Sequence, residues 1–309
     1  MKKNILFIIL FSLIASWTFA QDAAGDSTVV VKEKDKPVRS PFESGYIIDA
    51  QTTVIQNVHT LEFAIQHKFG TIQNGHSDLW GIFAPGASIR LGLDYVLLKN
   101  FQVGVGINNK NMTTDFNAKW TIMQQTRKNT FPVAIALYAN MAVDGRNISA
   151  FESGQVQVAH NLGSSNAFAA PDRLSYFSEL IVGRKFTDWF SLQGGISLTH
   201  YNSVALPYDH DKVAFHVNGR IKVTPQGSLI FTYDNPLQIK DISEQREWTN
   251  PPKPNLSFGY EISTSTHAFQ IYMSTGTGLI PQENVMWNQN DLTKQQFQIG
   301  FNITRLWGF

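Results

Sequence analysis

A histidine and a serine lie three residues apart in the segment His200-Tyr201-Asn202-Ser203, where they could supply the base and the nucleophile of a hydrolase. Successive side chains of a strand point to opposite faces, so residues three apart face opposite ways unless the next loop folds back. The spacing therefore argues against a catalytic pair.

Three other patterns could carry chemistry. Asp209-His210-Asp211 offers two carboxylates to a divalent cation, but the further oxygen ligands of such a site are not apparent. Gly104-x-Gly106 and Gly194-Gly195 do not open a helix, so they predict strand curvature or close packing rather than phosphate cradles. The absence of cysteine excludes disulfides, cysteine zinc sites and thiol nucleophiles. We therefore assign no catalytic, cofactor-binding or metal-ligating residue, and expect no cofactor.

Composition and the N-terminus indicate an exported, folded protein. Hydrophobic residues make up 43% and charged residues 16% of the 309 residues, which excludes a disordered chain. Residues 1–20 predict a signal peptide, because Lys2 and Lys3 precede an apolar run that ends at the small residue Ala20. Its removal lowers the formal net charge from +1 to −1, so no basic surplus for nucleic acid remains. Residues 21–41 predict a flexible periplasmic leader.

Alternation of apolar and polar residues dominates the chain from His59 to Phe309 and predicts about 12 strands and no convincing helix. The predicted strands cover residues 61–69, 89–95, 101–107, 116–122, 133–141, 173–186, 190–198, 213–223, 229–233, 256–262, 269–273 and 297–303. Their connections alternate between tight turns and longer polar loops, with residues 109–112 as a short exception. This pattern is typical of an antiparallel up-and-down β-barrel in the bacterial outer membrane, with short periplasmic turns and long outer loops. A secreted soluble β-sandwich is the alternative.

Charged residues on the polar strand faces are expected to line the lumen of this barrel. They are Glu62, Lys68, Arg90, Asp94, Asp115, Lys119, Arg220, Lys222, Asp234 and Glu261. Their mixed signs predict paired charges on neighbouring strands rather than an ion-selective ring, with Arg90 or Lys119 facing Asp94, Asp115 or Glu62. About 12 strands permit either a narrow pore or a filled interior. Residues 42–58, without a clear period, are predicted to pack at the barrel mouth or to plug the lumen, and the sequence leaves both open.

The C-terminus resembles the last strand of outer-membrane proteins, closed by Phe309. In those proteins the terminal aromatic residue is a signal for the barrel-assembly machinery, so the resemblance implies this role for Phe309. From about Lys36 to Phe309 the chain is similar to an uncharacterised Bacteroidota family of β-barrels, known as a domain of unknown function. The segments that carry the resemblance are His67-Lys68-Phe69-Gly70, Ile89 to Tyr95, Phe131-Pro132-Val133, Asp172 to Phe177, Gly183-Arg184-Lys185-Phe186 and Phe190 to Gln193. The segment Ser265 to Gln270 departs from the pattern, where a Gly-rich turn is expected.

Three functions are compatible with such a barrel. The first is a narrow, porin-like channel or transporter for small solutes. The second is a structural or partner-docking envelope barrel with a closed, charge-filled lumen. The third is an outer-membrane hydrolase, for which the sequence gives little support, so we expect a protein that is not an enzyme. The expected partners are outer-membrane lipid, the barrel-assembly machinery and another envelope protein.

Overall fold

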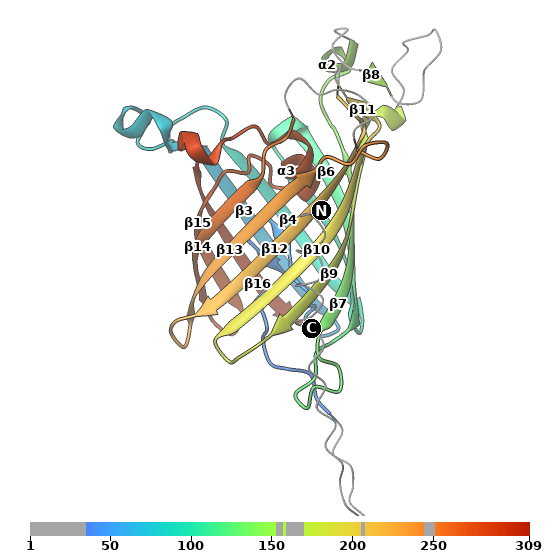
Figure 1. Cartoon of the computed structure of the whole chain (residues 1–309), viewed down its shortest axis with the longest axis vertical. Helices are drawn as coiled ribbons and strands as arrows, with labels where there is room; N and C mark the ends of the chain where they lie inside the picture. Colours follow the sequence, from blue (N-terminus) through green and yellow to red (C-terminus); the bar gives the residue numbers. More distant parts are fainter. Residues whose placement is uncertain (1–34, 153–156, 159–169, 205–207, 244–250) are drawn as a thin grey trace, which may run out of the picture. The chain divides into compact units, whose positions relative to one another are not determined.

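Twelve antiparallel strands close into a barrel in the computed structural model (Figure 1), as the alternation predicted. The structure describes residues 35–309 except 153–156, 159–169, 205–207 and 244–250. The predicted signal peptide and residues 21–34 of the predicted leader lie outside the described residues. The barrel strands are β3 (Thr60–Thr71), β4 (Ser88–Leu98), β5 (Phe101–Asn108), β6 (Thr113–Met123), β7 (Ala134–Val143), β9 (Leu174–Lys185), β10 (Phe190–Tyr201), β12 (Asp211–Lys222), β13 (Gly227–Leu237), β14 (Asn255–Ser263), β15 (His267–Ser274) and β16 (Gln298–Gly308).

Each barrel strand pairs with its sequence neighbours, and β16 pairs with β3 to close the sheet. Closure leaves no sheet edge, so the backbone polar groups of the wall are paired within the protein, as a lipid environment requires. The short turns gather at one end of the barrel and the long connections at the other (Figure 1). Short and long connections therefore alternate along the sequence because successive connections lie at opposite ends of the barrel.

Short helices within the connections between strands correct the expectation that the chain has no convincing helix. They are η1 (Ile72–Asp78), η2 (Lys110–Met112), α2 (Ser149–Glu152), η3 (Ala170–Arg173), α3 (Pro281–Trp287) and η4 (Leu292–Lys294). In the same connections β8 (Gln157–Val158) pairs with β11 (Ser203–Val204). In the part of the chain that the structure describes, no helix is long and apolar enough to cross a membrane.

The wall of the barrel is apolar outside and polar inside. The strand residues that face outward include large apolar side chains that are between 37% and 68% exposed: Ile89, Leu91, Leu93, Ile107, Phe116, Trp120, Leu137, Leu180, Ile196, Leu198, Leu229, Phe258, Ile262 and Ile271. The residues that alternate with them point inward and are buried, although many are charged or amides. A soluble protein would bury the apolar face, so this arrangement is that of a barrel surrounded by lipid.

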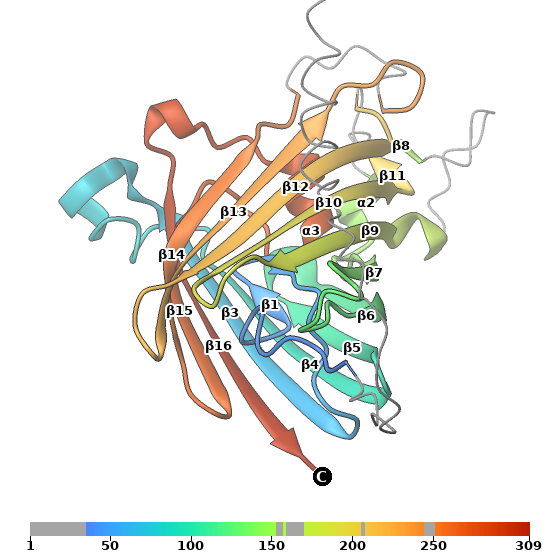
Figure 2. The same cartoon turned by 60° about the horizontal axis from the view of Figure 1, so that its bottom comes forward.

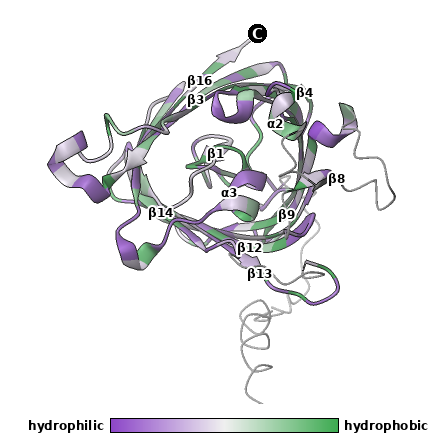
Figure 3. Cartoon of the chain, turned by 90° about the horizontal axis from the view of Figure 1, so that it is seen from above, coloured by the Kyte–Doolittle hydropathy of each residue, from purple (hydrophilic) through white to green (hydrophobic). Residues whose placement is uncertain are grey.

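The lumen contains two segments of the chain itself. A small hairpin of β1 (Tyr46–Ile47) and β2 (Ala50–Gln51) lies inside the ring of strands, and so does α3 (Figures 2 and 3). We call residues 42–57 the plug segment. Its apolar residues Phe42, Ile47 and Ile48 form a buried cluster with Ile230 and Tyr272 of the wall. These residues therefore pack against the inner face of the wall, within the ring of strands (Figure 3).

Candidate functional site

The predicted lumen charges all lie on inward-facing positions of the strands. Lys222, near the periplasmic end, is half-buried. The others are at most 7% exposed: Glu62, Lys68, Arg90, Asp94, Asp115, Lys119, Arg220, Asp234 and Glu261. Burial of so many charges is costly unless each has a partner, so their contacts define what the lumen is built to hold.

One ion pair crosses a whole strand. Arg90 on β4 and Asp115 on β6 are joined by two hydrogen bonds of 2.7 and 2.8 Å, although β5 runs between them. The intervening residue is Gly106, where an added Cβ would lie 2.4 Å from both side chains. The glycine is therefore required for close packing of two charged neighbours, and the pair is one of those expected from the sequence.

Other predicted lumen charges bind the plug segment rather than one another. The Glu62 carboxylate accepts a hydrogen bond from the backbone N–H of Gly45, and the Asp94 carboxylate accepts one from the Tyr46 hydroxyl. Lys119 Nζ donates to the Gly45 carbonyl at 3.3 Å and to Gln51 Oε1 at 3.1 Å. These hydrogen bonds differ from the expected wall-to-wall pairs, because the plug segment lies between the charged side chains.

Lys68 connects the plug segment with the connection between β15 and β16. Its ammonium group forms an ion pair with Asp49 of the plug segment. The same group donates to the carbonyls of Gly276 and Gly278, both at 2.7 Å. Asn284 of α3 contacts the same Asp49 carboxylate at 3.4 Å. One buried cation therefore holds together both segments that occupy the lumen.

Amide side chains of the wall bind the backbone of the plug segment. The Ile48 N–H donates to Gln270 Oε1 at 2.9 Å, and Asn302 Nδ2 donates to the Ile48 carbonyl at 2.7 Å. Gln193 Nε2 donates to the Gln51 carbonyl at 2.6 Å. These hydrogen bonds satisfy backbone groups that would otherwise be buried without partners. The polar wall is therefore complementary to this segment.

Arg220 marks the periplasmic part of the same interface. Its guanidinium donates to Glu261 of the wall at 3.1 Å and to Glu43 of the plug segment at 2.6 Å. Glu261 also accepts from Gln270 Nε2 at 2.8 Å. The network therefore continues from wall to plug on this side of the lumen.

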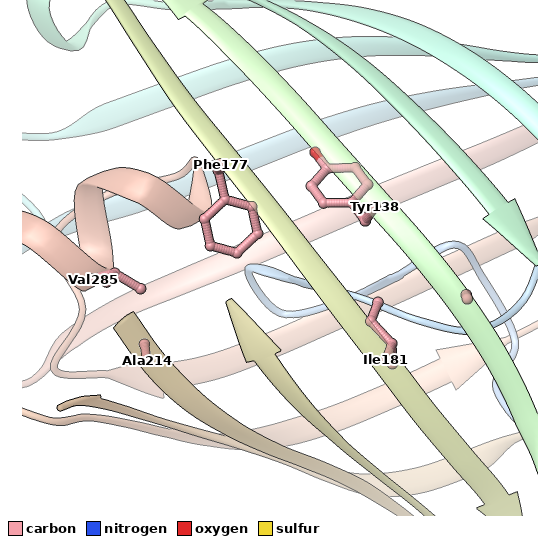
Figure 4. Packing of buried hydrophobic residues seen from close by; sticks show 6 residues of the cluster. Tyr138, Phe177, Ile181, Ala214 and Val285 are labelled. Carbon is pink, nitrogen blue, oxygen red and sulfur yellow. The ribbon is translucent and has the colours of Figure 1, made fainter. Parts of the chain in front are cut away.

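Helix α3 occupies a second region of the lumen. Gln282 Nε2 donates to Asn140 Oδ1 of β7 at 2.7 Å, and Glu283 lies 3.9 Å from Lys110 Nζ. Val285 packs in a buried cluster with Phe177, Ala214 and other wall residues, shown in Figure 4. The sequence predicted this region as a polar loop. A seven-residue helix is too short to show a hydrophobic period, which explains the error.

A serine, a histidine and an aspartate form a chain of hydrogen bonds in the lumen that sequence reasoning missed. Ser197 Oγ lies 2.7 Å from His216 Nε2, and His216 Nδ1 lies 2.8 Å from Asp234 Oδ1. The three residues come from the consecutive strands β10, β12 and β13 and are at most 7% exposed. The alternation places all three on inward faces, but the strand register is needed to bring them together.

The pattern His200 to Ser203 does not form the catalytic pair that was considered. His200 faces outward and its Nδ1 lies 2.8 Å from Asp211 Oδ1, while Ser203 belongs to β11. The neighbouring His210 Nδ1 contacts the Tyr201 carbonyl at 2.6 Å. Among the described residues, no group of three histidine or acidic side chains is placed to hold a metal ion.

A hollow of about 850 Å³ is lined by residues of β6, β7, β9, β10 and β12 together with Asp241 and Ile242. Its small residues Ala118, Ala139 and Ser178 are paired across the strands and share the outward face with exposed Phe116 and Leu198. The lining also includes Asn140, Phe177 and Lys212, whose side chains are buried on the inward face of the wall.

Phe309 follows the last strand and is 82% exposed. Its N–H donates to the His59 carbonyl at 3.2 Å, which ties the C-terminus to the start of β3.

Comparison with solved structures gives barrels of low sequence identity. KdgM porin in complex with disordered oligogalacturonate matches with a TM-score of 0.43 and 7% identity, over 81% of this chain and 99% of that chain. The NanC porin matches with a TM-score of 0.45 and 8% identity, again over 81% and 99%. An outer membrane channel from Pseudomonas putida F1 has a TM-score of 0.46 and 9% identity, over 82% and 97%.

Comparison with curated protein sequences gave no match. A family model, by contrast, matches residues 42–307, which include the plug segment and nearly the whole barrel. Together with the lipid-facing wall, this match places the protein in the outer membrane. The chain belongs to the family described as membrane bound beta barrel domain (DUF5777).

Proposed function

We propose that this protein is an outer-membrane channel for small solutes, closed by its own plug segment. The observation that carries the proposal is that charged side chains of the lumen wall bind the plug segment. Residues 45–51 are bound by Glu62, Asp94, Lys119 and Lys68. A lumen that serves only as a filled core would be expected to pair these charges with one another. A segment held by polar contacts can exchange them for water when it leaves, at much lower cost than an apolar core.

The chain that precedes the plug segment supports control from the periplasmic side. The Val38 N–H donates to the Gln125 carbonyl at 2.9 Å, and the Arg127 N–H donates to the Lys36 carbonyl at 2.9 Å. Residues 36–38 therefore run beside the β6–β7 turn, at the end of the barrel that carries the short turns. A periplasmic envelope partner that binds the leader would be in position to withdraw the plug segment.

The experiment is conductance in planar bilayers of the wild-type protein and of a variant that lacks residues 42–57. The deletion should raise single-channel conductance severalfold or more, while heat-modifiable gel migration reports that the barrel still folds. Equal conductance of the two folded proteins would contradict the proposal.

A second candidate is a closed structural or partner-docking barrel. The occupation of the lumen by both the plug segment and α3 favours it, because the two are linked through Lys68. A folded deletion variant that stays non-conducting would support this function. The Bacteroidota origin and the role of Phe309 in assembly, both implied by resemblance, remain predictions.

A further inference from the structure

The hydrogen-bonded residues Ser197, His216 and Asp234 have the arrangement that activates a serine nucleophile. Activation requires a base within hydrogen-bond reach of the hydroxyl and a third group that orients the base. Here the Ser197–His216 and His216–Asp234 contacts are both shorter than 2.9 Å. With Nδ1–H donating to Asp234, the His216 Nε2 lone pair is free to accept the Ser197 hydroxyl proton. The neutral tautomer needed for catalysis is thus the one that the carboxylate favours.

The surroundings hold the histidine in this orientation. His216 and Asp234 are directly opposite each other on β12 and β13, and Asn255 Nδ2 donates to the second Asp234 oxygen at 2.8 Å. The Phe177 ring meets the imidazole edge to face, with centroids 6.1 Å apart. Ring rotation would break these contacts, so the geometry is preorganised.

A second carboxylate faces the same imidazole. Glu179 lies on β9 opposite Ser197 and interacts electrostatically with His216. Its side chain lies over Gly195, where an added Cβ would be 2.4 Å from Glu179 Oε1. Glu179 Oε1 is buried and has no hydrogen-bond partner among the described residues. An imidazolium that forms on His216 would therefore face the carboxyl groups of both Asp234 and Glu179.

The second apolar cluster of the lumen lies next to the serine. Ala214 is the direct strand partner of Ser197, and it belongs to the buried cluster with Phe177, Ile181 and Val285 (Figure 4). Apolar residues beside a nucleophile suit the acyl part of an ester better than a charged or sugar-like group. The cluster therefore indicates the class of substrate.

We propose that Ser197, His216 and Asp234 form a nucleophilic serine site that cleaves carboxylic esters with an apolar acyl group, a function beyond the proposed channel. Ser197 Oγ forms a bond to the carbonyl carbon while its proton moves to His216 Nε2. The carbon–oxygen bond of the ester breaks, and His216 gives the proton to the leaving alkoxide. Water then attacks the acyl-serine with His216 as base, which releases the acid and restores the hydroxyl.

Access to this site requires movement of α3. Ser197 is 1% exposed, and Val285 of α3 packs in the cluster that contains its strand partner Ala214. Val285→Ala would loosen this packing and should make the serine easier to reach. This variant keeps the plug segment intact, so it separates the site from the channel proposal.

The test uses the full-length protein in detergent and a small probe, diisopropyl fluorophosphate, with adducts located by peptide mass spectrometry. The Ser197 oxygen should bond to phosphorus with loss of fluoride, faster in Val285→Ala than in the wild type. His216→Gln should slow labelling by about 10²- to 10⁴-fold. Ser257→Ala is the matched control, because Ser257 is a buried lumen serine bonded to Ser274 rather than to a histidine.

Hydrolysis of a p-nitrophenyl ester with a short alkyl chain should follow the same order among these variants, and Ser197→Ala should abolish it. Heat-modifiable migration verifies that each variant is folded. Absence of an adduct on Ser197 in both the wild type and Val285→Ala would overturn the proposal. Labelling that is unchanged by His216→Gln would overturn it as well, since a merely structural hydrogen bond gives no activated nucleophile.

Discussion

Replacement of Lys68 by methionine should weaken both the barrel and its attachment to the plug segment. Methionine keeps most of the side-chain length but removes the cation that Asp49 faces, and the two side chains are 0% and 5% exposed. Removal of one partner of a buried pair typically costs about 3–5 kcal/mol, because it leaves an uncompensated charge. The variant also strands the carbonyls of Gly276 and Gly278. We therefore expect a loss near the upper end of this range.

The assay is the free energy of unfolding in urea, measured with the protein in lipid vesicles. Addition of Asp49→Asn to Lys68→Met removes the stranded charge and should recover about 1 kcal/mol or more. Asp49 and Lys68 then show a coupling energy in the double-mutant cycle. Additive effects within about 0.5 kcal/mol would refute the reasoning, because independent sites behave in this way.

Three other perturbations test separate parts of the structure. Gly106→Ala should lower the free energy of unfolding in urea by about 1–3 kcal/mol, because the added methyl group intrudes between the ion-paired side chains of Arg90 and Asp115. Gly194→Ala is the control and should be nearly neutral, because its Cβ would lie 3.5 Å from the nearest atom. Deletion of Phe309 should lower the amount of folded protein in the outer membrane in cells; an unchanged amount would end the assembly proposal. Hydrogen bonds from Thr293 and Lys253 hold the pKa of Asp291 in an outer loop below its usual range. The ionised Asp291 therefore stabilises the loop at pH values above the ordinary aspartate pKa, and this stabilisation is lost as the pH falls through the lowered pKa. Proteolysis of the loop should increase from about pH 4 downward, and Asp291→Asn should remove this pH dependence.

The wall of the barrel could be predicted from the sequence because its period is local. Strands such as 89–95 and 190–198 alternate residue by residue, and the same alternation separates lipid-facing Leu198 from lumen-facing Ser197. The lengths of the connections then assign the two ends of the barrel. These features depend only on residues close together in the sequence and on the two-residue period of a strand, so a single sequence is enough to predict them.

The contents of the lumen could not be predicted in the same way. Residues 42–57 have no period, and their place depends on contacts with residues more than 200 positions away, such as Gln270 and Asn302. The pairing of Ser197 with His216 depends on the register of β10 against β12. The hydrogen bonds of Lys119 to Gly45 and Gln51 could not be foreseen, because nothing in the local sequence shows that another segment lies beside it.

The central claim, that the plug segment closes a channel, is tested most directly by a reversible lock. The chain has no cysteine, and a Cβ on Gly183 of β9 would lie 3.1 Å from the Thr53 side chain of the plug segment. A variant with both Thr53→Cys and Gly183→Cys can therefore form a single disulfide between plug and wall. We predict that, at a voltage high enough to open the wild-type channel, the oxidised protein stays closed in planar bilayers and opens once a reductant is added. Equal conductance before and after reduction, in protein whose disulfide is shown to form and break, would contradict the account.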